Sequence, residues 1–158
     1  MMKIAVFAGS FDPFTLAHLD LVNRSLSLFD KVVIGIGVNS AKQGLMSYQE
    51  REDVISAIFA AEDRVEVQQF KGLTVQFCDQ VRSTYLLRGL RNTNDFEFEN
   101  AIAQNNLIMA PHVETFFLMA KSGLAHISST IVRDIFQHGG DISNLVPADV
   151  SAFLYRND

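Results

Sequence analysis

Gly9-Ser10-Phe11-Asp12-Pro13-Phe14-Thr15-Leu16-Ala17-His18 is the stretch that decides the fold of this chain. It follows the apolar run at residues 4–8, which has the composition of a buried parallel strand. A glycine turn comes next, and Thr15 can then cap a helix that carries His18 in its first turn. Free backbone N–H groups at such a helix start attract anions. The stretch therefore predicts a strand, a turn and a helix that together bind a phosphate.

A second stretch, Ile127-Ser128-Ser129-Thr130-Ile131-Val132-Arg133, repeats this arrangement with hydroxyl groups and an arginine. Its three consecutive hydroxyl residues could simply cap a helix, but one cap does not need three of them. We therefore expect their N–H and O–H groups to bind phosphates. Arg133 could be a phosphate ligand or a structural residue. Two such stretches in one chain suggest a ligand with several phosphates.

Apolar strands alternate with amphipathic helices along the whole sequence. Strands are expected at residues 3–8, 31–38, 64–69, 84–88 and 114–119, and helices at residues 17–28, 47–61, 74–82, 94–109, 129–138 and 148–155. This alternation predicts a single α/β domain over residues 1–158, with a doubly wound parallel sheet of about five strands. Ligands of such sheets bind at the carboxyl ends of the strands. Both stretches quoted above, together with Lys42 and residues 88–91, follow predicted strand ends.

Charge and cysteine content narrow the class of ligand and the compartment. The net charge of −5 argues against nonspecific binding of nucleic acid. Basic residues nevertheless converge at Lys42, Arg88, Arg91 and Arg133, which suits a small polyanion. No apolar run approaches the roughly 20 residues of a membrane helix. Cys78 is the only cysteine, so no internal disulfide can form, and we expect a core residue in a cytoplasmic protein.

The sequence lacks one common phosphate-binding motif and has one candidate metal cluster. There is no G-x-x-x-x-G-K-[ST] phosphate loop, so helix starts and side chains must hold the phosphates. Asp95, Glu97 and Glu99 could form a metal cluster, but their spacing also fits a charged helix face, which we favour. We predict no metal bound directly by the protein.

At these residues the chain resembles the nucleotidyltransferase superfamily marked by T-x-G-H or H-x-G-H and I-S-S-T-x-x-R elements. Within it, the chain is most similar to the bacterial phosphopantetheine adenylyltransferase family. Further matches in the order and spacing of that family are Lys42, Arg88-Gly89-Leu90-Arg91, Asp95-Phe96-Glu97-Phe98-Glu99 and Asn106. The resemblance covers nearly the whole chain. It implies a Rossmann-like nucleotidyltransferase fold and reversible transfer of an adenylyl group from ATP to 4′-phosphopantetheine, a step of coenzyme A biosynthesis.

The same resemblance implies roles for individual residues. The catalytic residues would be His18, Lys42 and Arg91. Phosphopantetheine would contact Ser10, Lys42, Thr74, Arg88, Ile102 and Asn106. ATP would contact Gly9, Ser10, Phe11, His18, Gly89, Leu90, Arg91, Glu99, Leu124, Ala125, His126, Ile127, Ser128, Ser129 and Thr130. The resemblance also implies Mg²⁺ carried on the ATP phosphates, other ligands of the coenzyme A pathway, and a homohexamer.

Three residues depart from the family pattern. Ala17 stands where the family has a glycine before the histidine, and Ala allows helical geometry at the expense of one added methyl group. Leu124 replaces an aromatic residue common near the adenine, so the stacking partner of the base stays open. Phe98 replaces a common tyrosine. We expect binding to survive the change at Ala17.

Two alternative functions remain. A sister enzyme, such as a nicotinate-mononucleotide adenylyltransferase or a glycerol-phosphate cytidylyltransferase, would share both phosphate motifs. Residues 88–91, residues 95–99 and Asn106 favour the pantetheine enzyme. A nucleotide-binding regulatory protein without turnover is the second alternative, and intact His18, Lys42 and Arg88 argue against it.

Overall fold

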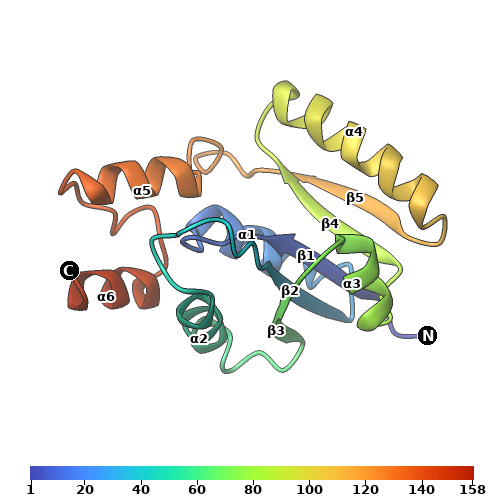
Figure 1. The fold of residues 1–158 in the computed structure, drawn as a ribbon, viewed down its shortest axis with the longest axis horizontal. Coiled ribbons are helices and arrows are strands. Elements are labelled where there is room, and N and C mark those ends of the chain that lie inside the picture. Colours follow the sequence, from blue (N-terminus) through green and yellow to red (C-terminus); the bar gives the residue numbers. More distant parts are fainter.

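A computed structural model describes all residues 1–158 and shows one sheet of five parallel strands (Figure 1). The strands are β1 (Ile4–Gly9), β2 (Lys31–Gly37), β3 (Val65–Phe70), β4 (Tyr85–Leu90) and β5 (Glu114–Met119). Their order is β3-β2-β1-β4-β5, and every neighbouring pair is parallel. The chain winds outward from β1 to β3 and then crosses to the other side for β4 and β5. The predicted doubly wound sheet is confirmed.

Six helices complete the fold. They are α1 (Leu16–Ser25), α2 (Tyr48–Ile58), α3 (Thr74–Gln80), α4 (Thr93–Met109), α5 (Ser129–Gln137) and α6 (Ala148–Arg156). All six were expected, but α1 and α2 end earlier than the predicted residues 28 and 61. At the end of α1 the N–H of Leu28 donates to the Ser25 carbonyl, a tighter turn that closes the helix.

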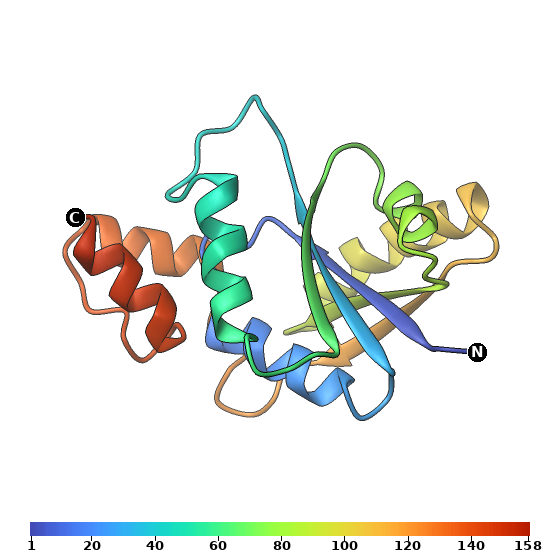
Figure 2. The same ribbon diagram turned by 90° about the horizontal axis from the view of Figure 1, so that it is seen from below.

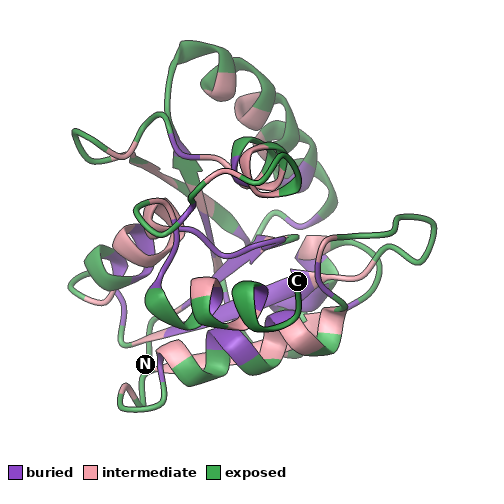
Figure 3. Ribbon diagram, turned by 90° about the vertical axis from the view of Figure 1, so that its left-hand side faces the viewer, coloured by how far each residue is buried: buried purple, intermediate pink, exposed green.

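Both faces of the central strands β1 and β2 are buried, as continuous apolar strands require. Alternate residues of a strand point to opposite faces, so Ala5 and Phe7 of β1 join one core while Val6 and Ala8 join another. The larger core contains residues of α1, α2, α5 and α6, and the smaller contains residues of α3. Figure 2 shows α5 and α6 beside α2, and Figure 3 shows the buried residues gathered in the central strands. The helices therefore leave the carboxyl ends of β1 and β4 accessible.

Candidate active site

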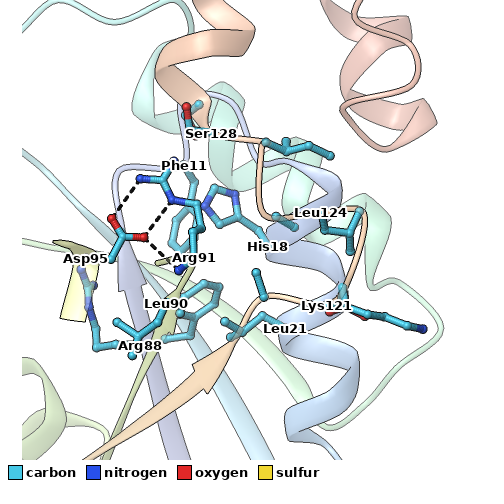
Figure 4. Close-up of a pocket in the computed structure, with 18 of the residues that line it drawn as sticks. Phe11, His18, Leu21, Arg88, Leu90, Arg91, Asp95, Lys121, Leu124 and Ser128 are labelled. Atoms are coloured by element: carbon cyan, nitrogen blue, oxygen red, sulfur yellow. Dashed lines mark hydrogen bonds and ion pairs between the residues drawn. The ribbon is translucent and has the colours of Figure 1, made fainter. Parts of the chain in front are cut away.

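A cleft lies at the carboxyl ends of β1 and β4, where the order of the strands reverses (Figure 4). Its main cavity has a volume of about 330 Å³ and is bounded by the β1–α1 loop, α1, the end of β4 and the segment before α5. Two smaller cavities, of about 140 and 300 Å³, adjoin it, and Arg88 lines all three. This is the position at which doubly wound sheets bind their ligands.

Most residues expected to contact ATP line the main cavity. They are Gly9, Ser10, Phe11, His18, Gly89, Leu90, Arg91, Glu99, Leu124, Ile127, Ser128 and Ser129. Ala125, His126 and Thr130 do not line it and are exposed beside it. The two stretches that decide the fold, more than 100 residues apart, thus meet across one space.

The residues expected to contact phosphopantetheine occupy the adjoining cavities. Thr74, Arg88, Ile102 and Asn106 line the smallest one, and Ser10, Thr74 and Arg88 line the third. Lys42 lines none of the three cavities. It is exposed in the β2–α2 loop, and its side chain makes no hydrogen bond or ion pair with the rest of the chain. The structure therefore brings together all of this set except Lys42.

His18 is held in one orientation by the start of its own helix. The Oγ1 atom of Thr15 accepts from the His18 N–H, and the Nδ1 atom of His18 accepts from the Thr15 N–H at 3.0 Å. This is a capping box with histidine in the place of the usual glutamate or glutamine. Because Nδ1 is an acceptor, the proton of the neutral ring is on Nε2.

The surroundings of His18 keep it uncharged. Its ring lies among those of Phe7, Phe11 and Phe14, with centroid distances of 5.0–5.9 Å. Burial, and then the positive charges of Arg88 and Arg91, lower the pKa of His18 to about 4. The imidazole is therefore neutral at pH 7 and offers its Nε2–H as a donor. Figure 4 shows it pointing into the same space as the Arg91 guanidinium.

Aromatic packing also shapes the β1–α1 loop. Phe11 has a φ of 48°, an uncommon value for a residue with a side chain, and its ring packs against Phe7 and Phe14. A Cβ atom at Gly9 would lie only 3.1 Å from the Phe11 ring. Gly9 is therefore the residue that lets the ring fold back against the end of β1.

Two of the three arginines that line the main cavity, Arg88 and Arg91, are held by carboxylates from α4. Arg88 donates from Nε and Nη2 to the two oxygens of Glu99, at 2.8 and 2.7 Å, and from Nη1 to the Ala8 carbonyl at 2.6 Å. Arg91 pairs with Asp95 through Nε and Nη2, and the Arg91 N–H donates to the same carboxylate. Hydrogen bonds from Arg91 lower the pKa of Asp95. Glu99, which was expected to contact ATP, thus also orients Arg88, which was expected to contact phosphopantetheine.

The hydroxyl groups at the start of α5 serve the fold itself. Ser128 caps α5 by accepting from the Ile131 N–H at 3.2 Å, and Ser129 Oγ donates to the Pro13 carbonyl at 2.8 Å. Arg133 donates to the Asp12 carbonyl at 2.7 Å and to Thr130 Oγ1 at 3.2 Å. Arg133 therefore connects α5 to the β1–α1 loop. The donors left to bind an anion here are the O–H groups of Ser128 and Thr130, which only accept within the chain, and the first backbone N–H groups of α5.

Sequence reasoning missed several residues on the cleft wall. From α1 these are Asp20, Leu21 and Arg24, and after β5 they are Ala120 and Lys121. Helical spacing could have found Leu21, three residues after His18, and Arg24, three residues after Leu21. The rule that ligands meet strand ends could have found Lys121. Arg24 and Lys121 each add a positive charge to the cavity wall, which suits a phosphate-bearing ligand.

Comparison with known proteins identifies the family. The cytidylyltransferase-like family model matches residues 6–135. Phosphopantetheine adenylyltransferase of Christiangramia forsetii is 47% identical over 146 residues, covering 92% of this chain and 96% of the relative. The Cytophaga hutchinsonii enzyme of the same name is 48% identical, covering 93% and 98%, and the Leptospira biflexa enzyme is 43% identical, covering 99% and 98%.

A solved structure supports the fold independently. A Vibrio parahaemolyticus protein assigned to the nicotinate-nucleotide adenylyltransferases superposes with a TM-score of 0.74 at 22% identity, covering 99% of this chain and 93% of that one. At that identity the likeness concerns the fold alone. The family match and the near full-length relatives agree with the geometry of the cleft, and the chain belongs to the phosphopantetheine adenylyltransferase family of cytidylyltransferase-like nucleotidyltransferases.

Proposed function

We propose that the cleft between β1 and β4 performs the reaction of this family. The enzyme transfers the adenylyl group of ATP to 4′-phosphopantetheine, giving 3′-dephospho-coenzyme A and pyrophosphate in coenzyme A biosynthesis. One observation carries the assignment to this cleft: a neutral histidine donor and two fixed guanidinium groups surround a cavity that continues, at Arg88, into two smaller ones. Such a layout suits two phosphate-bearing substrates that meet at one point.

On the ATP side, the main cavity offers donors to each phosphate. His18 Nε2–H would donate to the α-phosphoryl group, where charge develops during transfer. Arg91 and the first N–H groups of α5 would hold the departing pyrophosphate. Arg91 is able to do so because its side chain remains 38% exposed beside Asp95.

On the acceptor side, Arg88 and Ser10 stand between the main cavity and the smaller ones. We assign the phosphate of phosphopantetheine to these residues together with Lys42. The pantetheine arm would follow the cavity lined by Thr74, Ile102 and Asn106. In this proposal the attacking phosphate oxygen would approach the α-phosphate from the side opposite the pyrophosphate, as in-line transfer requires.

The chemistry requires no general base. The attacking oxygen belongs to a phosphate already ionised at pH 7, so no proton must be removed. Catalysis then depends on in-line positioning and on neutralisation of negative charge. The fixed arginines and the single tautomer of His18 supply both without rearrangement during the reaction.

Magnesium would enter with the nucleotide. No three His, Cys, Asp or Glu side chains are grouped so that they could hold a metal ion. The cleft carboxylates Asp20, Asp95 and Glu99 each pair with an arginine. This donor set fits an ion coordinated by phosphate oxygens and water. When bound, Mg²⁺ adds positive charge to the phosphates.

Self-association is supported by an exposed apolar surface. It includes Phe98 and Ile108 of α4, with 69% and 80% of their surface exposed, together with Met109 of α4 and Met119 of the edge strand β5. Apolar side chains gathered in this way mark interaction surfaces. A homohexamer built through this surface is our proposal for the assembly. Light scattering of the purified protein would test it.

We also propose that the protein lies in the cytoplasm. Cys78 is buried, and burial raises the pKa of its thiol to about 12, so it is a packing residue without a disulfide partner. None of the helices has the length and apolar character needed to cross a membrane. A reducing compartment suits this chemistry.

The deciding experiment is a pyrophosphate-release assay with ATP and a panel of acceptors. We expect release with 4′-phosphopantetheine and none with nicotinate mononucleotide; CTP with glycerol phosphate should also be inactive. Turnover with either alternative acceptor, and none with phosphopantetheine, would overturn the assignment. Tight ATP binding without any turnover would instead indicate a regulatory protein.

A further inference from the structure

The β2–α2 loop carries Lys42, and a buried carboxylate ties one end of that loop to the β1–α1 loop. Asp12 is 5% exposed. Its Oδ2 accepts from the Leu45 N–H and its Oδ1 accepts from the Met46 N–H, both at 2.9 Å. A charged group thus satisfies the backbone of a segment more than 30 residues away. The two loops are therefore joined just after the tip that bears Lys42.

A buried arginine extends this connection to the cleft wall. Arg51 of α2 is 4% exposed, and its Nε lies 3.4 Å from the Asp12 carboxylate. It donates from Nε and Nη2 to the Met46 carbonyl, at 3.0 and 2.8 Å, and from Nη1 to the Ser10 carbonyl at 3.0 Å. One guanidinium thus bonds both to Ser10, which lines two of the cavities, and to the end of the Lys42 loop.

The other end of the loop is fixed by a residue that touches the same arginine. The Tyr48 hydroxyl accepts from the Asn39 N–H and donates to the Asn39 carbonyl, each at 2.9 Å. The Arg51 guanidinium lies over the Tyr48 ring, 4.4 Å from its centroid. Residues 40–44 between these anchors are exposed. Lys42 is therefore the tip of a loop with both ends fixed.

Gly44 shows how closely the loop follows this pair. A Cβ atom at Gly44 would collide with Nη2 of Arg51 and with the carboxylate of Asp12. Only a residue without a side chain can pass here. The backbone at Gly44, two residues after Lys42, therefore packs directly against the buried Asp12 and Arg51 side chains.

We infer that the buried Asp12–Arg51 pair is a positioning element that sets Lys42 relative to Ser10 and so shapes the acceptor-phosphate site. A buried ion pair adds little net stability, because desolvation offsets the attraction, but its hydrogen bonds fix geometry. The inference rests on the proposed function, since that assigns Lys42 to the acceptor. Misplacing a substrate-binding group by about 1 Å can cost up to about 100-fold in rate.

Asp12→Asn is the first test. Asparagine keeps the size of the side chain but removes the charge and sets an NH₂ group against one of the two loop N–H donors. We expect the KM for 4′-phosphopantetheine to rise about tenfold or more, with a smaller change in kcat and an ATP dissociation constant within about twofold of wild type. Asp63→Asn is the matched control. Asp63 is exposed and lies just before β3, at the amino ends of the strands, whereas the cleft lies at their carboxyl ends.

A double variant separates positioning from a general structural effect. In a Lys42→Ala background, Asp12→Asn should produce no further rise in the KM for phosphopantetheine, because there is no longer a lysine to position. Independent losses would multiply instead. A multiplied KM in the double variant would overturn the inference.

A second variant, Arg51→Lys, is tested by a measurement that does not depend on activity. It keeps the inference testable if Asp12→Asn does not fold. Lysine keeps the charge but cannot bridge Ser10 and Met46. Limited trypsin digestion of the folded variant should cut after Lys42 several-fold faster than in wild type. Unchanged cleavage and an unchanged acceptor KM in Arg51→Lys would refute the positioning role. If wild type itself releases no pyrophosphate with phosphopantetheine, the proposed function fails, while the digestion still tests the loop connection.

Discussion

The Nδ1 atom of His18 accepts a hydrogen bond from the backbone N–H of Thr15 at 3.0 Å. This contact completes the cap of α1 and at the same time places the ring proton on Nε2, the atom free to face the cleft. The same side chain therefore stabilises a helix start and prepares a phosphate donor. Its two roles can be separated by substitution.

His18→Ala removes both roles. We expect kcat to fall by on the order of 100-fold, because a donor aimed at charge developing in the transition state is lost. The free energy of unfolding should fall by about 1 kcal/mol from loss of the cap. Steady-state pyrophosphate release and urea unfolding measure the two effects.

His18→Gln is the matched control, since glutamine at this position can still complete the capping box. Its stability should lie closer to wild type than that of the alanine variant, while its turnover remains impaired. An alanine variant with near-normal turnover would show that His18 does not stabilise the transition state.

The free energy of unfolding of the enzyme without ligand should fall as the pH drops from 6.5 to about 4, the two pKa values of His18. The pKa of His18 is about 4 in the folded chain and 6.5 as a reference, so the unfolded chain binds the proton more readily. The contribution of the neutral His18 to the free energy of unfolding is fully present above pH 6.5. It declines toward pH 4, by at most about 3 kcal/mol. Urea unfolding at pH 7, 5.5 and 4 measures the decline.

Other groups also titrate in this range, so the comparison with His18→Gln isolates the histidine. The variant should lose less stability than wild type between pH 7 and pH 4. Parallel curves for the two proteins would mean that the histidine is not held neutral by the fold. Bound ATP should reduce the difference, because a phosphate beside the ring favours its charged form.

The sequence predicted the sheet because its central strands β1 and β2 are nearly continuous apolar runs. It predicted the helix starts because Thr15, Ser47 and Ser128 are strong caps. It also placed most of the cleft, since strand ends meet at one edge of the sheet. These features depend on local pattern and on topology. Both can be read along the chain.

What the sequence did not predict are the partners of individual side chains. Arg133 bonds to the Asp12 carbonyl, 121 residues away, and Arg88 bonds to the Ala8 carbonyl, 80 residues away. Neither spacing has a periodicity that could indicate contact. The hydrogen bond from the Ser129 hydroxyl to the Pro13 carbonyl, 116 residues away, was likewise not predicted. Pairings of this kind follow only from the packed structure.

Lys42→Ala and Arg88→Ala should both weaken use of phosphopantetheine more than binding of ATP, but they should differ in stability. The exposed Lys42 side chain has no partner to lose. Removing Arg88 leaves the Glu99 carboxylate, whose side chain is only 12% exposed, without its bidentate partner. We expect a loss of about 1–3 kcal/mol in the free energy of unfolding for Arg88→Ala and almost none for Lys42→Ala.

Calorimetric titration of each substrate and urea unfolding measure these effects. Equal losses of affinity for ATP and phosphopantetheine would refute the assignment of both residues to the acceptor. An Arg88→Ala protein as stable as wild type would mean that the Glu99 pair contributes nothing to the fold.

Ala17→Gly tests how closely the start of α1 approaches the nucleotide. Ala17 lines the main cavity and stands at the second position of α1, immediately before His18. Removing its methyl group should hold or improve ATP affinity, by at most about 1 kcal/mol. Stability should fall by about 0.5–1 kcal/mol, because glycine has lower helix propensity and adds freedom to the unfolded chain.

The two effects have opposite signs and are measured separately, by ATP titration and by urea unfolding. Ala57→Gly is the matched control, because Ala57 is an exposed residue of α2 that lines none of the three cavities. It should show the loss of stability without any change in ATP affinity. A clear loss of ATP affinity in Ala17→Gly alone would show that the methyl group helps to hold the helix start against the nucleotide, contrary to the expected close approach.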